Sequence, residues 1–175
     1  MIKKAIEYNG DLQAYLKKYN YQPELTNKLD CVGEHNFTQE LINEIVLWKV
    51  NRYVIAHQKL NNGLNQLVGL RNGEHKKGID ALSMLLNTHG VDLPMASTIL
   101  RFRNPNVFQI IDQHAYRAVY GSKYPLYTAA PVSRKIETYY GYLDKLIELC
   151  RKRKIDFVTS DRLLYIFDKE HNGKL

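Results

Sequence analysis

The stretch GVDLPMASTILRFRNPNVFQIIDQHAYRAV, residues 90–119, decides the fold of this chain. A turn at residues 90–92 separates two stretches in which apolar residues recur at helical spacing, and its glycine is typical of a helix end. Pro94 belongs in the first turn of the second helix, where a missing N–H costs nothing. The pattern predicts a tight helix-hairpin-helix near residues 77–103.

Helical spacing of apolar residues also recurs outside this stretch. Helices are predicted at 2–18, at 39–58 with Thr38 as the N-cap, at 64–70, at 113–120, at 132–153 and at 160–169. The turn-forming residues 61–63, Asn-Asn-Gly, predict a break before the third of these helices. The sequence therefore predicts an all-α fold with connecting loops of ordinary length.

Length and charge limit the partners of the chain. Its 175 residues suffice for one domain or for two small helical lobes, and its formal net charge is +7. This charge favours a polyanion such as nucleic acid over an acidic protein or a membrane surface. Neither a signal-peptide core nor the roughly 18 consecutive apolar residues of a membrane span is present. A cytoplasmic location without membrane contact is therefore expected, and the sequence does not indicate an oligomeric state.

The side chains that commonly bind cofactors are sparse. Cys31 and Cys150 are the only cysteines, too few for a cysteine zinc site or a four-thiolate iron–sulfur cluster. The six histidines show no ligand spacing for zinc. No cofactor, iron–sulfur cluster or transition metal is therefore expected.

The hairpin and the aspartate that follows it are the candidate functional features. A glycine lets the backbone approach a phosphate closely, and the N–H groups that open the second helix attract anions. On a basic protein, such a hairpin can hold a DNA strand without reading its sequence. Asp112 precedes the predicted helix 113–120, and aspartate is among the best N-cap residues. The sequence therefore leaves open whether Asp112 is a cap, a catalytic carboxylate or both.

The segments THGVDLPMASTILRF and IIDQHAYRAV together resemble the helix-hairpin-helix DNA glycosylases of the HhH-GPD superfamily. The hairpin of that superfamily reads approximately LPGVGxxTAxxxL, and its downstream segment reads approximately VDTHVxRV. The resemblance covers residues 88–119, and elsewhere only the order of the helices agrees. The matching residues are Gly90, Val91, Ala96 and Leu100 in the hairpin, and Ile111, Asp112, His114, Arg117 and Val119 downstream.

The resemblance implies a two-lobe fold and base excision from double-stranded DNA. Residues 38–111 would form the middle lobe with the hairpin, and residues 1–37 with 112–175 would form the second lobe. A damaged base would be flipped out of the duplex into a pocket between the lobes. Asp112 inherits the catalytic role: it would stabilise the oxocarbenium-like sugar or orient the attacking water.

The resemblance also implies residues that contact DNA or the flipped base. Carbonyls of the hairpin near Gly90 could hold a monovalent cation. Trp48 and His114 are pocket candidates, although packing in the core explains both residues as well, and Asn51 beside Trp48 is a third candidate. The candidate DNA contacts are the amides of Gly90, Val91 and Leu93 and the side chains of Lys76, Lys77, Arg101, Arg103 and Arg117, for which solvated surface positions are the alternative.

Two departures from the family pattern change what the resemblance implies. Pro94 stands where bifunctional members carry a lysine, and because proline has no amine, a Schiff-base lyase reaction through this position is excluded. Asp92 replaces the second hairpin glycine, which brings a negative charge close to the expected phosphate and a side chain that competes for the same N–H groups. Both departures favour the rival hypothesis of a catalytically inactive, glycosylase-derived module that binds DNA or another partner. A helical protein-interaction module without any DNA role is the third hypothesis.

Overall fold

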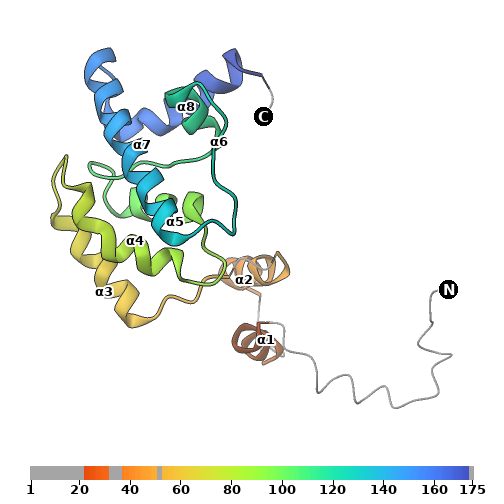
Figure 1. Ribbon diagram of the computed structural model, residues 1–175. Helices are drawn as coiled ribbons and strands as arrows, with labels where there is room; N and C mark the ends of the chain where they lie inside the picture. The colour runs from red at the N-terminus through yellow and green to blue at the C-terminus, as the bar shows by residue number, and fades with distance from the viewer. Residues whose placement is uncertain (1–21, 32–36, 51–52, 174–175) are drawn as a thin grey trace. The chain divides into compact units, whose positions relative to one another are not determined.

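The structure is a computed structural model that describes residues 22–31, 37–50 and 53–173. These residues form eight α-helices and no β-strand, which confirms the predicted all-α class (Figure 1). Within the same residues, no helix combines the length and the apolar character needed to cross a membrane. The chain divides into two units, 1–53 and 54–175. The predicted helix at 2–18 lies outside the described residues, and the predicted lobes of 38–111 and of 1–37 with 112–175 stay a prediction.

The first unit contains α1 (Pro23–Asp30) and α2 (Gln39–Lys49), which pack against each other. The predicted cap of α2 is confirmed, because the hydroxyl of Thr38 accepts a hydrogen bond from the Leu41 amide at 3.2 Å. The predicted length of this helix is wrong. The helix ends at Lys49, and residues 53–57 form no regular secondary structure, as suits a segment that contains the β-branched pair Val54-Ile55.

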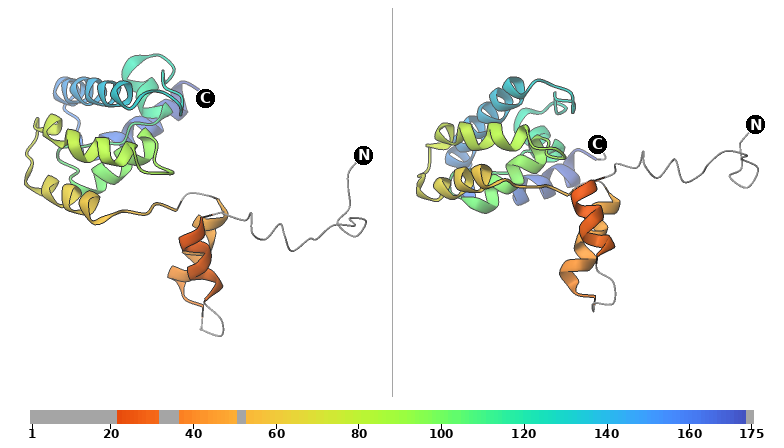
Figure 2. Two further views of the ribbon diagram at one scale, coloured as in Figure 1. Left: turned by 60° about the horizontal axis from the view of Figure 1, so that its bottom comes forward. Right: turned by 90° about the horizontal axis from the view of Figure 1, so that it is seen from below.

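The second unit contains the other six helices. Helix α4 packs against α3, α5 and α7, and helix α6 packs against α7 and α8 (Figures 1 and 2). The predicted bounds of α6 and α7 are confirmed, and α8 starts at the predicted residue. The helices are α3 (Gln58–Gln66), α4 (Ile79–Leu86), α5 (Leu93–Arg103), α6 (Gln113–Tyr120), α7 (Val132–Arg153) and α8 (Ser160–His171), with single 3₁₀ turns at Leu67–Gly69, His75–Gly78 and Phe157–Thr159.

Helix α3 runs through the Asn-Asn-Gly sequence at 61–63, so the predicted break there is wrong. Packing overrides the weak helix propensity of these residues, since Leu60 and Leu67 of the same segment are buried in the core. A Cβ atom at Gly63 would lie 2.6 Å from the terminal methyl of Met84 in α4. The glycine therefore lets α3 approach α4 closely.

The core of the second unit holds the non-helical segment that leads to Asp112. Residues 107–111 lie between α5 and α6, and Phe108 and Ile111 are fully buried. Two phenols of α7 fasten this segment: the hydroxyl of Tyr139 donates to the Gln109 carbonyl at 3.0 Å, and that of Tyr142 to the Ile110 carbonyl at 2.9 Å. The backbone before Asp112 is therefore fixed by α7.

Gly78 lies where the core has no room for a side chain. A Cβ atom at this position would lie 2.7 Å from Cζ of Phe108, whose ring is fully buried. We expect Gly78→Ala to lower the free energy of unfolding by about 1–3 kcal/mol, because the ring must shift to accept the methyl group. Gly69→Ala is the matched control, since a Cβ atom at Gly69 meets nothing within 4 Å. Equal denaturant midpoints for the two variants would contradict the steric explanation.

Candidate active site at the start of helix α6

Asp112 is the N-cap of α6. Its backbone is extended (φ −130°, ψ −178°), and its Oδ1 atom accepts a hydrogen bond from the Ala115 amide at 2.7 Å. No described residue donates a hydrogen bond to its other oxygen, Oδ2. The side chain is half-buried. Capping therefore occupies one carboxylate oxygen and leaves the other available.

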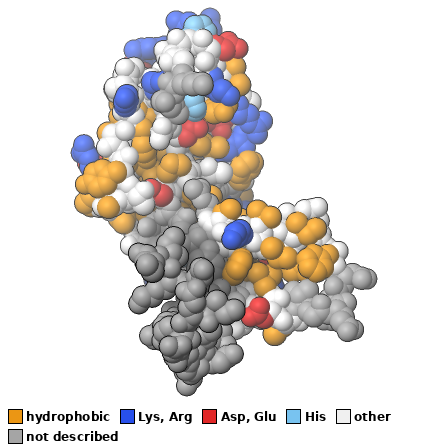
Figure 3. Space-filling view, turned by 90° about the vertical axis from the view of Figure 1, so that its right-hand side faces the viewer, with side chains coloured by type: hydrophobic (Ala, Val, Ile, Leu, Met, Phe, Trp, Pro, Cys, Tyr) orange, Lys and Arg blue, Asp and Glu red, His pale blue; other side chains and the backbone are white. Residues whose placement is uncertain are grey.

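A small surface pocket adjoins Asp112, between the start of α6 and the first two turns of α8. Its volume is about 260 Å³, and Asp112 and Asp161 are its two carboxylates. Ile110, Ala115 and Ile166 give it a mostly apolar wall. Helix α8 lies on the face drawn in Figure 3, where hydrophobic side chains stand among lysines and arginines. The pocket belongs entirely to the second unit.

Asp161 is a site residue that sequence reasoning missed. Its side chain is buried, its Oδ1 accepts a hydrogen bond from the Arg162 amide at 2.8 Å, and its Oδ2 lies 3.6 Å from Nε of Arg101. In the sequence it is one more acidic residue in the first turn of a helix, where a carboxylate is favoured in any case. Its position beside Asp112 depends on how α6 and α8 pack, which no local pattern reveals.

His114 and Arg117 project from α6 toward a buried carboxylate of α8. The side chain of Asp168 is fully buried, and it accepts hydrogen bonds from Nη2 of Arg117 at 2.8 Å and from Nδ1 of His114 at 2.7 Å. Asn172 donates a further bond at 2.8 Å. The Arg117 hydrogen bond, helped by those from Asn172 and His114, holds the pKa of Asp168 well below its usual value. The two α6 side chains thus tie α6 to α8, and neither lines the pocket beside Asp112.

The hairpin is formed by α4 and α5, but its connection is longer than predicted. Helix α4 ends at Leu86, so residues 87–92 separate it from α5, and Gly90 is not the residue that ends the helix. Gly90 is exposed and adopts a left-handed conformation (φ 78°) that only glycine takes readily. The side chains of Val91 and Leu93 are buried, and their amides donate within the fold: that of Val91 to the Thr88 carbonyl at 3.1 Å and that of Leu93 to Oδ1 of Asp92. Of the three predicted hairpin amides, these two are therefore already engaged.

Asp92 is both a helix cap and part of an ion pair. Its Oδ1 accepts a hydrogen bond from the Leu93 amide at 2.7 Å, and the ammonium of Lys135 lies 2.8 Å from the same oxygen. Lys135 is buried and also donates to the Thr128 carbonyl at 2.7 Å. The negative charge that Asp92 brings to the hairpin is therefore balanced by a lysine of α7, which sequence reasoning did not single out.

The five cations predicted to contact DNA differ in how they are placed. Lys76 and Lys77 are exposed and make only surface ion pairs, with Asp144 at 3.1 Å and Glu74 at 2.5 Å. Three arginines instead make contacts within the fold. Arg101 is buried and binds the Val158 carbonyl, Arg103 donates to the Leu64 and Asn65 carbonyls at the end of α3, and Arg117 binds Asp168.

The remaining pocket candidates, Trp48 and Asn51, do not belong to the second unit. Trp48 belongs to the first unit, where its indole N–H donates to the Thr26 hydroxyl at 2.9 Å. Asn51 lies outside the described residues. In the described parts of the chain, no group of three or more His, Cys, Asp or Glu side chains is arranged to hold a metal ion. The predicted monovalent cation at the hairpin carbonyls stays a prediction.

Comparison with models of known protein families, with curated proteins and with solved structures finds no match for the chain. The hypothesis about its function therefore depends on the hairpin, on Asp112 with its pocket, and on the resemblance of residues 88–119 to the HhH-GPD pattern.

Proposed function

We propose that this chain is a divergent HhH-GPD protein that binds duplex DNA and acts as a monofunctional DNA N-glycosylase. The observation that carries the proposal is the state of Asp112: one oxygen caps α6, and the other is available beside an open pocket. A carboxylate that only caps a helix needs no pocket. One that acts on a substrate needs both a fixed position and access from solvent.

In this proposal, Asp112 acts on the sugar of a flipped-out nucleotide. As the N-glycosidic bond breaks, positive charge develops on the sugar, and the free Oδ2 atom stabilises this charge or orients the attacking water. The cap to Ala115 and the phenol bonds to residues 109 and 110 hold the carboxylate in place before the substrate arrives. Pro94 offers no amine, so the reaction ends with release of the base.

The contacts of the hairpin support DNA binding of limited strength. Lys76 and Lys77 can reach a phosphate without breaking any buried contact, and Gly90 is exposed. The ion pair with Lys135 removes the main electrostatic objection to Asp92. For affinity, the proposal relies on the lysines rather than on Arg101, Arg103 and Arg117, whose contacts lie within the fold.

The second candidate is a catalytically inactive module that retains DNA binding or binds another protein. The size of the pocket favours it, because about 260 Å³ is below the roughly 300–1,000 Å³ typical of small-molecule sites.

Binding and base release separate these candidates. We expect the affinity for undamaged duplex DNA to fall steeply as the salt concentration rises. The double variant Lys76→Gln, Lys77→Gln should reduce the slope of log affinity against log salt concentration by about 2, because each phosphate contact contributes about 0.9. Fluorescence anisotropy over a salt series measures this slope. Replacing Lys123 and Lys145, exposed lysines outside the hairpin, removes the same charge as a control.

The second part of the experiment incubates the protein with a panel of duplexes that each carry one damaged base, and it measures released base by mass spectrometry. Release from at least one duplex supports the glycosylase. Binding to DNA without release from any duplex favours the inactive module, and affinity that does not depend on salt would contradict both nucleic-acid hypotheses.

A further inference from the structure

Four successive cations, residues 151–154, stand at the C-terminal end of α7. Arg151, Arg153 and Lys154 are exposed, and no described residue forms an ion pair with them. Lys152, between them, pairs with Glu148 at 2.5 Å. By contrast, the arginines of the hairpin region and Lys135 bind carbonyls or carboxylates of the fold. The C-terminal end of α7 therefore carries a concentration of unpaired positive charge.

This charge exceeds what the helix itself requires. The C-terminus of a helix carries roughly half a negative charge, which one cation would balance. Lys154 adopts a left-handed conformation (φ 54°, ψ 41°), and the amides of Lys154 and Ile155 both bond to the Cys150 carbonyl. The chain thereby turns back at Lys154, so that residues 155–158 lie against the last turns of α7.

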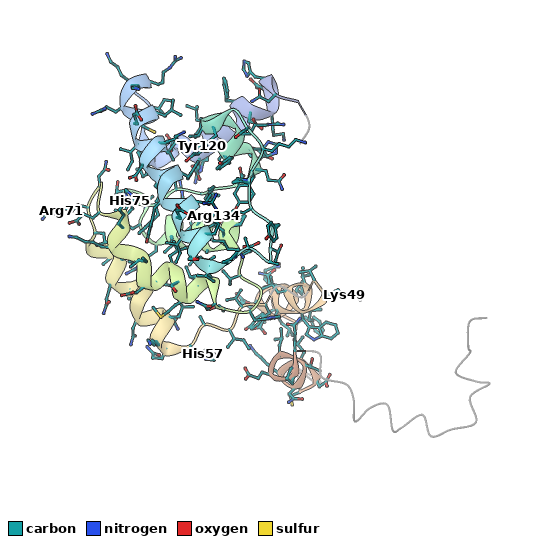
Figure 4. All side chains as sticks on the ribbon, viewed as in Figure 1. Lys49, His57, Arg71, His75, Tyr120 and Arg134 are labelled. Carbon is teal, nitrogen blue, oxygen red and sulfur yellow. The ribbon has the colours of Figure 1, made fainter. Side chains whose placement is uncertain are left out.

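A second pocket opens beside these cations. Its volume is about 500 Å³, and Arg151 forms part of its lining. Ile147, Ile155 and Phe157 form apolar walls, and Asn72 and Asn106 contribute amides that make no side-chain hydrogen bond within the described residues. The turn that carries Asn72 is the one between Arg71 and His75, which lies beside α7 in Figure 4.

The one carboxylate in this lining is already engaged. Asp156 accepts hydrogen bonds from the Val158 amide at 3.1 Å and from the Thr159 hydroxyl at 3.3 Å, as the cap of a 3₁₀ turn. Its single charge offsets only part of the positive charge on Arg151, Arg153 and Lys154. The pocket thus combines an arginine, an aromatic side chain and free amides in its lining, and two further exposed cations, Arg153 and Lys154, follow Arg151 in the chain.

We propose that the end of α7 and this pocket bind a single strand of nucleic acid. The phosphates lie along Arg151, Arg153 and Lys154, and one unpaired base enters the pocket against Phe157, within reach of the Asn72 and Asn106 amides. A basic surface that follows the backbone, combined with an aromatic side chain that stacks on a base, is how proteins hold single strands without reading sequence. A base paired in a duplex could not enter. The inference rests on the proposed function only in assuming that the protein binds DNA, and it does not require Asp112 to be catalytic.

The test compares two triple variants with equal loss of charge. One carries Arg151→Gln, Arg153→Gln and Lys154→Gln; the control carries Lys59→Gln, Lys123→Gln and Arg134→Gln, all exposed and away from the pocket. Arg134 lies at the other end of α7 (Figure 4). The probe is a labelled oligothymidylate of about ten nucleotides, within the usual site size of a single-strand groove.

We expect the α7 variant to bind this probe about 100-fold more weakly at 0.1 M salt, with a log–log salt slope reduced by about 2, because each phosphate contact with a single strand contributes about 0.7. The control should keep the wild-type slope, and both variants should unfold at the wild-type temperature.

A second probe with the same backbone but without bases tests the pocket. The wild-type protein should bind this probe about tenfold more weakly than oligothymidylate, because stacking on the aromatic side chain is lost. The salt slope should be unchanged, because the phosphate contacts remain.

Three results would overturn the inference: no binding of oligothymidylate by the wild-type protein, equal losses in the two variants, or equal affinity for the two probes. None of these measurements uses a damaged duplex or base release. Failure here and failure of the proposed glycosylase are therefore distinguishable.

Discussion

Asp168→Ala is expected to lower the free energy of unfolding by about 3 kcal/mol, the low end of the range for breaking a buried ion pair. The substitution removes a fully buried carboxylate and leaves Arg117 and His114 facing a cavity. Both partners keep some access to solvent, with exposed side-chain fractions of 15% and 19%, which is why we expect the low end. Chemical denaturation followed by circular dichroism measures the change.

Glu170→Ala on the same helix is the control for this prediction. Glu170 is exposed, so its replacement should change stability by no more than about 0.5 kcal/mol. If Asp168→Ala unfolds at the same denaturant concentration as Glu170→Ala, the network does not hold α6 on α8.

The same network determines a dependence of stability on pH. The hydrogen bond from Arg117, with those from Asn172 and His114, holds the folded-state pKa of Asp168 below its unfolded value, which is about 4. A depressed carboxyl pKa contributes stability that is fully present above the unfolded pKa and is lost as pH falls toward the folded pKa. The stability difference between the wild type and Asp168→Ala should therefore be constant above about pH 5 and shrink below pH 4.

Asp112→Asn is expected to reduce base release by about 10²–10³-fold, as the loss of one well-placed electrostatic group does in other active sites. An amide cannot stabilise positive charge on the sugar as a carboxylate does. Asparagine is nearly as good an N-cap as aspartate, so the Ala115 amide keeps its acceptor. Stability should fall by less than about 1 kcal/mol, through the lost interaction with the helix dipole. Single-turnover release from the responsive duplex gives the rate, and thermal unfolding gives the stability.

Asp112→Ala separates the two roles of this residue. It removes the cap as well as the charge, so it should lose about 1 kcal/mol of stability in addition to the activity. If Asp112→Asn releases base at the wild-type rate, Asp112 is a cap only, and the glycosylase proposal fails at its central residue.

The helices that the sequence predicted well are those in which local signals and packing agree. Helix α7 has apolar residues on one face along its whole length, and Gly121 ends α6 in the left-handed conformation that glycine favours. The predictions failed where packing outweighs local propensity. Residues 61–63 read as a turn, yet they continue a helix because Leu60 and Leu67 are buried and because Gly63 gives Met84 room.

The roles of the arginines could not be predicted, because their partners are distant in the sequence. Arg101 binds the carbonyl of Val158, which is 57 residues away, and Arg103 binds that of Leu64, which is 39 residues away. Arg117 binds the carboxylate of Asp168, which is 51 residues away. An arginine at a helix end reads the same in the sequence whether it faces solvent or another helix. Asp161 was missed for the same reason. The cap at Asp112 could be predicted because it is local to the residues beside it, whereas its catalytic role was inferred only from the resemblance of residues 88–119 to the HhH-GPD pattern.

The phenol hydrogen bonds of α7 have a consequence for the energetics of the proposed catalysis. Residues 107–111 belong to no helix, and such a segment would ordinarily lose conformational freedom when a substrate becomes bound beside it. Here Tyr139 and Tyr142 have already removed that freedom during folding, by holding two successive carbonyls. In the proposed reaction, Asp112 would therefore follow a segment that is already ordered, and no binding energy would be needed to order that segment. The conformational entropy of residues 107–111 was lost when α7 packed against them during folding.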